Sequence, residues 1–125
     1  MTVGLCHGCF DILHPGHLRH LELAKARVDW LVVGITSDRW VTANKGPRHP
    51  FVSQEDRAYM LRALRYVDEV VIDDNPTPEA LLRRLKPDLY FKGEDYETLQ
   101  CLLAAQKQIV EQYGGALVLL GAKTY

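Results

Sequence analysis

The most constraining feature of this sequence is the regular alternation of short apolar runs with segments of helical periodicity. Five apolar or β-branched runs have the length of strands: residues 3–7, 29–36, 68–72, 88–91 and 116–120. The second run, DWLVVGIT, is nearly continuous in apolar residues, which is typical of a strand buried on both faces of a parallel sheet. Five such runs separated by helices predict an α/β fold, a Rossmann-like, doubly wound parallel sheet of five strands with helices on both faces.

The segments between these runs indicate where the helices begin and end. We expect helices over residues 15–26, from 53 onward, over 78–85 and over 99–113. Pro15 suits a first helical turn because its missing N–H would have no partner there, and Ser53 with Asp56 resembles a helix N-cap. Residues 37–52 are polar and contain one glycine and two prolines, so we expect this stretch to be the longest loop.

Composition limits the class of protein. The chain has 125 residues, 47% hydrophobic and 25% charged, which suits one domain over residues 1–125. Its net charge of −1 argues against a nucleic-acid partner. No apolar run approaches the roughly 20 residues that cross a bilayer, and no basic leader precedes the first run, so we expect no membrane or export segment. Three cysteines, an odd number, argue against a disulfide framework and favour a reducing, cytoplasmic location.

The segment between the first strand and the first helix, GCFDILHPGH at residues 8–17, carries the chemistry. It follows the carboxyl end of a strand, where doubly wound sheets bind ligands, and Gly8 and Gly16 let a ligand approach the backbone. His14 and His17 bracket the start of the helix, where unpaired N–H groups and the positive dipole end favour an anion. Imidazoles three residues apart in a first helical turn can face the same way, so the pair can donate hydrogen bonds to reacting phosphates.

Several motifs resemble those of the cytidylyltransferase-like nucleotidylyltransferases. Residues 14–17, His-Pro-Gly-His, match the H-x-G-H signature, and residues 8–11, Gly-Cys-Phe-Asp, resemble the G-x-F-D opening. Residues 45–57, 66–70 and 92–96 are similar to the family's mobile loop and second helix, its third strand and its K-G-x-D-Y motif. Together these motifs cover nearly the whole chain in the family's order. The resemblance is strongest to the adenylyltransferase domain of heptose-phosphate enzymes, followed by the glycerol-phosphate cytidylyltransferases.

The resemblance implies a transfer without a covalent enzyme intermediate. The phosphate oxygen of a sugar or polyol phosphate would attack the α-phosphorus of ATP or CTP, with Mg²⁺ accompanying the triphosphate, and pyrophosphate would leave. His14, His17 and Lys45 would be the catalytic residues that stabilise the charge. The nucleotide-binding residues implied by the resemblance are Gly8, Cys9, Phe10, Asp11, Gly16, Arg57, Lys92, Gly93 and Asp95.

The resemblance also implies partners. Many relatives dimerise, so we expect a homodimer, and in the heptose-type enzymes a sugar kinase often adjoins this domain. The family usually carries a Ser/Thr-rich phosphate-binding motif after the fifth strand, where this sequence has residues 121–125, Gly-Ala-Lys-Thr-Tyr. We therefore expect a further segment or a partner subunit to complete the site; otherwise the chain would bind nucleotide without turnover.

The same segment leaves a second chemistry open. Cys6 and Cys9 form a C-x-x-C pair which, with His14 and His17, has a spacing that a zinc site or a redox pair could use. Residues three apart on a strand need not point the same way, so we expect Cys6 to be a buried apolar residue and the chain to hold no metal of its own.

The remaining histidines of this region are assigned outside the site. His7 is expected to be an ordinary strand-end residue, and His20 is expected to be exposed to solvent. The alternative for His14 and His17 is a role in capping the helix alone.

Overall fold

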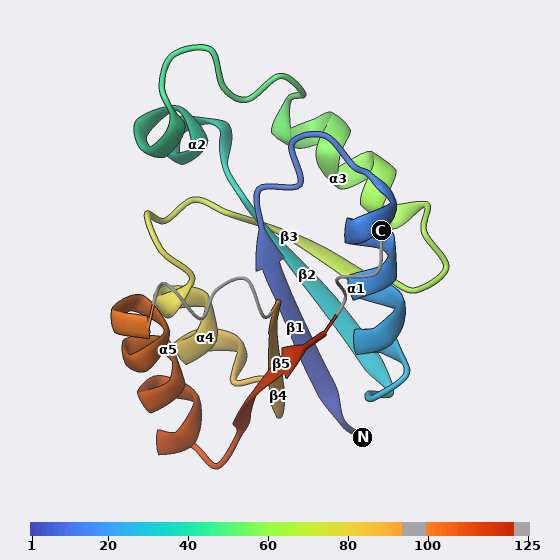
Figure 1. The fold of residues 1–125 in the computed structure, drawn as a ribbon, viewed down its shortest axis with the longest axis vertical. Helices are drawn as coiled ribbons and strands as arrows, with labels where there is room; N and C mark the ends of the chain where they lie inside the picture. Colours follow the sequence, from blue (N-terminus) through green and yellow to red (C-terminus); the bar gives the residue numbers. More distant parts are fainter. Residues whose placement is uncertain (94–99, 122–125) are drawn as a thin grey trace.

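A computed structural model describes residues 1–93 and 100–121 and contains a five-stranded sheet flanked by helices (Figure 1). The strands are β1 (Val3–Gly8), β2 (Trp30–Thr36), β3 (Glu69–Asp73), β4 (Leu89–Gly93) and β5 (Ala116–Leu120). Their order is β3-β2-β1-β4-β5, and each neighbouring pair is parallel. The chain winds outward from β1 to β3 and then returns to β4, so the direction of winding reverses beside β1.

Helices cover both faces of this sheet, which confirms the predicted doubly wound architecture. On one face lie α1 (Pro15–Lys25) and α3 (Gln54–Arg62), and on the other lie α4 (Glu79–Leu85) and α5 (Gln100–Gln112) (Figure 1). α2 (Asp38–Lys45) lies beyond the end of β2 and leads into α3.

The strands supply two cores because successive side chains point to opposite faces. Cys6 of β1 and Phe91 of β4 pack with α1 and α3, whereas their neighbours Leu5 and Tyr90 pack with α4 and α5. All four side chains are at most 1% exposed. Burial of each large apolar side chain stabilises the fold by about 1.5–3 kcal/mol, so the central strands hold the sheet edge above them in place.

Two helix starts agree with the sequence-based expectation. Pro15 occupies the first position of α1, and the Ser53 hydroxyl accepts a hydrogen bond of 3.2 Å from the backbone N–H of Asp56 at the start of α3. Among the described residues, no helix is both long and apolar enough to cross a membrane.

The stretch 37–52 is not one long loop, because residues 38–45 form α2. Asp38 in its first turn and Lys45 in its last suit the helix dipole, and Gly46, with a φ of 104°, ends it. The buried residue of this short helix is Val41, so its sequence lacks the apolar stripe by which helices are recognised. α2 matters for function because it places Lys45 at the carboxyl edge of the sheet.

Candidate active site

A cavity of about 640 Å³ opens at the carboxyl ends of β1 and β4, where the winding reverses. Its wall also includes the first turns of α1, the end of α2, the loop before α3 and the segment between β3 and α4. The wall contains ten of the twelve predicted site residues: Gly8, Cys9, Phe10, Asp11, His14, Gly16, His17, Lys45, Lys92 and Gly93. Arg57 lies outside it, and Asp95 falls outside the described residues.

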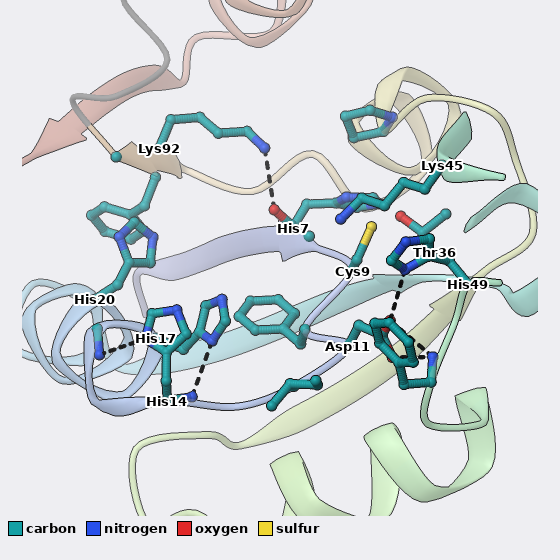
Figure 2. A pocket seen from close by; sticks show the side chains of 18 of the residues that line it. His7, Cys9, Asp11, His14, His17, His20, Thr36, Lys45, His49 and Lys92 are labelled. Atoms are coloured by element: carbon teal, nitrogen blue, oxygen red, sulfur yellow. Dashed lines mark hydrogen bonds and ion pairs between the residues drawn. The ribbon is translucent and has the colours of Figure 1, made fainter. Parts of the chain in front are cut away.

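The two histidines of the H-x-G-H motif form a reciprocal cap at the start of α1. Nδ1 of His14 accepts a hydrogen bond of 3.0 Å from the backbone N–H of Gly16, and Nδ1 of His17 accepts one of 3.3 Å from the backbone N–H of His14. The ring centroids are 3.9 Å apart (Figure 2). The histidines therefore cap the helix, and both also line the cavity, so the capping bonds leave them a place in the site.

The cap fixes where each ring carries its proton. A backbone N–H can only donate, so both Nδ1 atoms are unprotonated acceptors and the protons sit on the two Nε2 atoms. The pKa of His17 is lowered by its partial burial and by the neighbouring His14 and Lys45 side chains. The ring of His17 is therefore neutral near pH 7. The pair thus supplies two N–H donors beside a helix N-terminus, an arrangement suited to phosphate oxygens.

Phe10 supports His17 from the side of β1. It has a φ of 50°, in the left-handed region that few non-glycine residues adopt, and its ring centroid lies 5.3 Å from that of His17. Gly8 makes room for this ring, because a Cβ at Gly8 would lie 3.2 Å from it. Phe10 is only 7% exposed, so it contacts the imidazole from within the core and also forms part of the cavity wall.

Asp11 ties the strand–helix segment to the loop before α3. Its carboxylate accepts hydrogen bonds of 2.8–2.9 Å from the backbone N–H groups of Phe51 and Val52. Burial alone would raise the pKa of Asp11, but these bonds hold it below its usual value, so the group is ionised at neutral pH. The same carboxylate lies 3.6 Å from Nδ1 of His49, which closes this side of the cavity.

Arg57 is held beneath the cavity rather than in it. Its guanidinium, 0% exposed, donates to the backbone carbonyls of Cys9, Thr36 and Val52 and pairs with the Asp38 carboxylate at 2.8 Å. These contacts fix the backbone at Cys9 and at the start of α2. The structure therefore does not bring Arg57 to the predicted contact with nucleotide.

Two lysines give the cavity positive charge from opposite sides (Figure 2). Lys45 reaches it from the exposed end of α2. Lys92 is 7% exposed, and its ammonium donates to the carbonyl of His7 at 3.1 Å. Burial lowers the pKa of Lys92 to about 8, so a bound anion would favour its charged form.

Two histidines that were expected outside the site line the cavity. Nε2 of His7 lies 2.8 Å from a carboxylate oxygen of Asp73, and the two side chains are 6% and 1% exposed. His20 is partly buried on α1, one turn after His17, and burial lowers its pKa to about 4. The sequence missed these roles because Asp73 is 66 residues from His7 and because the inner face of α1 extends one turn further than the motif.

The two cysteines of the C-x-x-C pair separate. Cys6 is buried in the core between the sheet and α1, where desolvation raises its pKa to about 12, and Cys9 lines the cavity. Over residues 1–93 and 100–121, no three His, Cys, Asp or Glu side chains are placed to hold a metal ion together. The zinc hypothesis therefore gains no support from the described part of the chain.

The sequence matches a family model described as cytidylyltransferase-like over residues 5–116. Relatives named bifunctional protein HldE include one from Syntrophotalea carbinolica, 42% identical over 95% of this chain, and one from Campylobacter fetus subsp. fetus, 53% identical over 76% of it. This chain spans 24% and 21% of the length of those two proteins, so it matches about a quarter of each.

Solved structures agree on the fold. A lipopolysaccharide core biosynthesis protein from Thermoplasma volcanium GSS1 superposes with a TM-score of 0.80 and 25% identity, covering 100% of this chain and 98% of that one. A pantoate-beta-alanine ligase from Francisella tularensis has a TM-score of 0.65 over 96% of this chain and 59% of its own, and at 16% identity it supports the fold alone. With its family match, its relatives and the histidine pair at the winding reversal, the chain belongs to the cytidylyltransferase-like family of nucleotidyltransferases.

Proposed function

We propose that this chain transfers a nucleotidyl group from a nucleoside triphosphate to the phosphate of a sugar or polyol phosphate, with release of pyrophosphate. The donor is ATP and the acceptor is a heptose phosphate, because the relatives named HldE match most of the chain. The second candidate within this activity is a glycerol-phosphate-type cytidylyltransferase that uses CTP.

The observation that carries this proposal is the pair of Nε2–H donors at the start of α1. In the transfer, an oxygen of the acceptor's phosphate bonds to the α-phosphorus while the bond to the leaving pyrophosphate breaks. Negative charge grows on the phosphoryl oxygens and on the leaving group. His14 and His17 stabilise that charge by donating hydrogen bonds, and Lys45 and Lys92 add electrostatic attraction. The attacking group belongs to the substrate, so no protein nucleophile is required.

Mg²⁺ enters as part of the nucleotide substrate in this proposal. It prefers oxygen ligands, whereas the described cavity wall offers imidazoles, ammonium groups and the carboxylate of Asp11. That carboxylate is occupied by the N–H groups of Phe51 and Val52. The phosphate oxygens of the triphosphate are therefore the ligands that suit the ion best.

We extend the proposal to the natural setting of the chain. The relatives are about four times longer and bear the word bifunctional in their names, which supports a neighbouring sugar kinase domain. A homodimer remains our expectation for assembly. The free thiols of Cys6 and Cys9 support a reducing, cytoplasmic environment.

A direct assay tests the activity. The protein is incubated with ATP, CTP, GTP or UTP, with Mg²⁺ and with either a heptose 1-phosphate or glycerol 3-phosphate, and pyrophosphate is measured. We expect release with ATP and the heptose phosphate. If nucleotide binds but no combination of triphosphate and acceptor releases pyrophosphate, the transfer is contradicted and the chain is a nucleotide-binding module without turnover.

We predict that His17→Ala lowers turnover by about two to four orders of magnitude, equivalent to about 3–5 kcal/mol of lost transition-state stabilisation. Steady-state pyrophosphate release measures this effect, and nucleotide affinity should fall less than turnover.

A matched variant separates chemistry from capping. His17→Gln keeps a side-chain acceptor for the N–H of His14, so the helix start and the melting temperature should be preserved while turnover stays low. Activity close to the wild-type level in His17→Gln would show that the transfer does not require an imidazole at this position.

A further inference from the structure

The buried pair of His7 and Asp73 is not used by the proposed transfer, yet it reaches the cavity wall. His7 is on β1 and Asp73 is on β3, so the pair spans the whole width of β2. It crosses β2 above Gly34, where a Cβ would lie 2.8 Å from the His7 ring and 2.8 Å from Leu81. The missing side chain at Gly34 therefore lets a β1 residue bond to a β3 residue.

The pair fixes the protonation of the His7 ring. Asp73 is a carboxylate, since hydrogen bonds from His7 and from the Asn75 amide, 2.8 and 2.7 Å long, lower its pKa despite the opposing effect of burial. Nε2 of His7 must therefore carry the proton that it donates to Asp73. Burial lowers the pKa of His7 in spite of Asp73, so its other nitrogen, Nδ1, is unprotonated.

An unprotonated imidazole nitrogen is a hydrogen-bond acceptor. Within the described residues, nothing is hydrogen-bonded to Nδ1 of His7, and the ring lines the cavity. The wall beside it includes Thr36 of β2 and Pro76 and Pro78 of the segment between β3 and α4. This side of the cavity thus presents an acceptor that is backed by the Asp73 carboxylate, while the ammonium of Lys92 bonds to the backbone carbonyl of the same histidine.

The α1 side of the cavity has the opposite chemistry, because His14 and His17 supply N–H donors beside a helix N-terminus. Phosphate oxygens only accept hydrogen bonds, so they suit that side. A sugar or polyol hydroxyl can donate, so it suits an acceptor such as Nδ1 of His7.

We propose that His7, held by Asp73, is a specificity-determining residue that accepts a hydrogen bond through Nδ1 from one hydroxyl group of the acceptor substrate. This inference rests on the proposed function, in that it assigns where the carbon skeleton of the sugar or polyol phosphate lies. It places the hydroxylated part of the acceptor toward β3 and its phosphate toward α1.

Binding measurements test the contact without turnover. Titration calorimetry is carried out with glycerol 3-phosphate, a heptose 1-phosphate and their monodeoxy analogues, with α,β-methylene ATP present. For a parent compound that binds, loss of one particular hydroxyl should weaken binding to the wild-type protein by about 10- to 100-fold. The ¹⁵N resonance of Nδ1 of His7 should shift when the parent is added and stay unchanged with that analogue.

Variants complete the test. His7→Phe/Asp73→Asn removes the acceptor together with the charge that would otherwise be buried, and it should bind the parent and the deoxy analogue within about threefold of each other. Asp74→Asn is the matched control, because this neighbouring carboxylate contacts Ser37 and Arg39 instead, and it should discriminate as the wild type does.

The possible outcomes separate this contact from the transfer reaction. The contact is overturned if neither parent binds, if no deoxy analogue is discriminated, or if the double variant discriminates like the wild type. Discrimination without pyrophosphate release would support the contact and contradict the transfer, and pyrophosphate release without discrimination would do the reverse.

Discussion

At the scale of single residues, Arg57 shows how a buried charge can organise a site that it does not enter. Its guanidinium reaches the end of β1 through Cys9, the end of β2 through Thr36 and the start of α2 through Asp38. A buried charge is tolerated only when its donors are satisfied, and here each contact is 2.7–2.9 Å long. One side chain therefore sets the relative positions of the segments that carry the cavity wall.

We predict that Arg57→Met lowers the free energy of unfolding by about 3–5 kcal/mol, because it leaves three carbonyls and the Asp38 carboxylate without their donor. Urea denaturation measures the effect. Arg62→Met is the control, since Arg62 is exposed on the same helix and should change stability by less than about 0.5 kcal/mol. Equal effects of the two substitutions would contradict the role assigned to Arg57.

At the scale of elements, β2 combines a continuous apolar sequence with one position, Gly34, that leaves no room for a side chain. Its residues alternate between the two cores, and at Gly34 the space over the strand is filled by His7 of β1 and Leu81 of α4. The absence of a side chain at Gly34 thus allows both the packing of Leu81 on β2 and the pairing of His7 with Asp73 at the cavity.

We predict that Gly34→Ala destabilises the protein by about 1–3 kcal/mol, because the new methyl group must displace either the imidazole or Leu81. Thermal or urea unfolding measures the change. Gly93→Ala is the matched control, since its Cβ would meet nothing within 4 Å, and it should be tolerated. A Gly34→Ala protein as stable as Gly93→Ala would mean that the ring has room to move.

The elements also show what the sequence could predict. The five strands and the start of α1 were predicted because apolar runs and the residues of helix starts are local signals. α2 was missed because Val41 alone gives it no periodicity. The pairing of His7 with Asp73 and the burial of Arg57 depend on strand order and on contacts up to 66 residues apart, which local patterns do not encode.

At the scale of the whole molecule, the histidines make stability depend on pH. Burial lowers the pKa of His20 from 6.5 to about 4, and it lowers the pKa of His7 and His17 as well. Because the pKa of each of these histidines is lower in the folded chain, the unfolded chain binds more protons as the pH falls below about 6.5, and stability therefore falls as pH falls. The carboxylates of Asp11 and Asp73 act in the same direction, but only below their ordinary pKa of 3.8.

We predict that the free energy of unfolding decreases steadily as the pH is lowered from 6.5 to 4.5, with His20 contributing about 3 kcal/mol over its full titration. Urea denaturation at several pH values measures the slope, which should be smaller in His20→Gln. A wild-type stability that is constant or rises on acidification in this range would refute the assignment.

The reciprocal cap at the start of α1 has an evolutionary consequence. In many enzymes, reactive groups are carried at the expense of stability, so selection for activity and selection for foldability oppose each other. Here each ring uses one nitrogen to complete the helix, and both rings line the cavity. A mutation at either position would therefore be selected against for two reasons, because it would weaken the start of the helix and would impair the reaction.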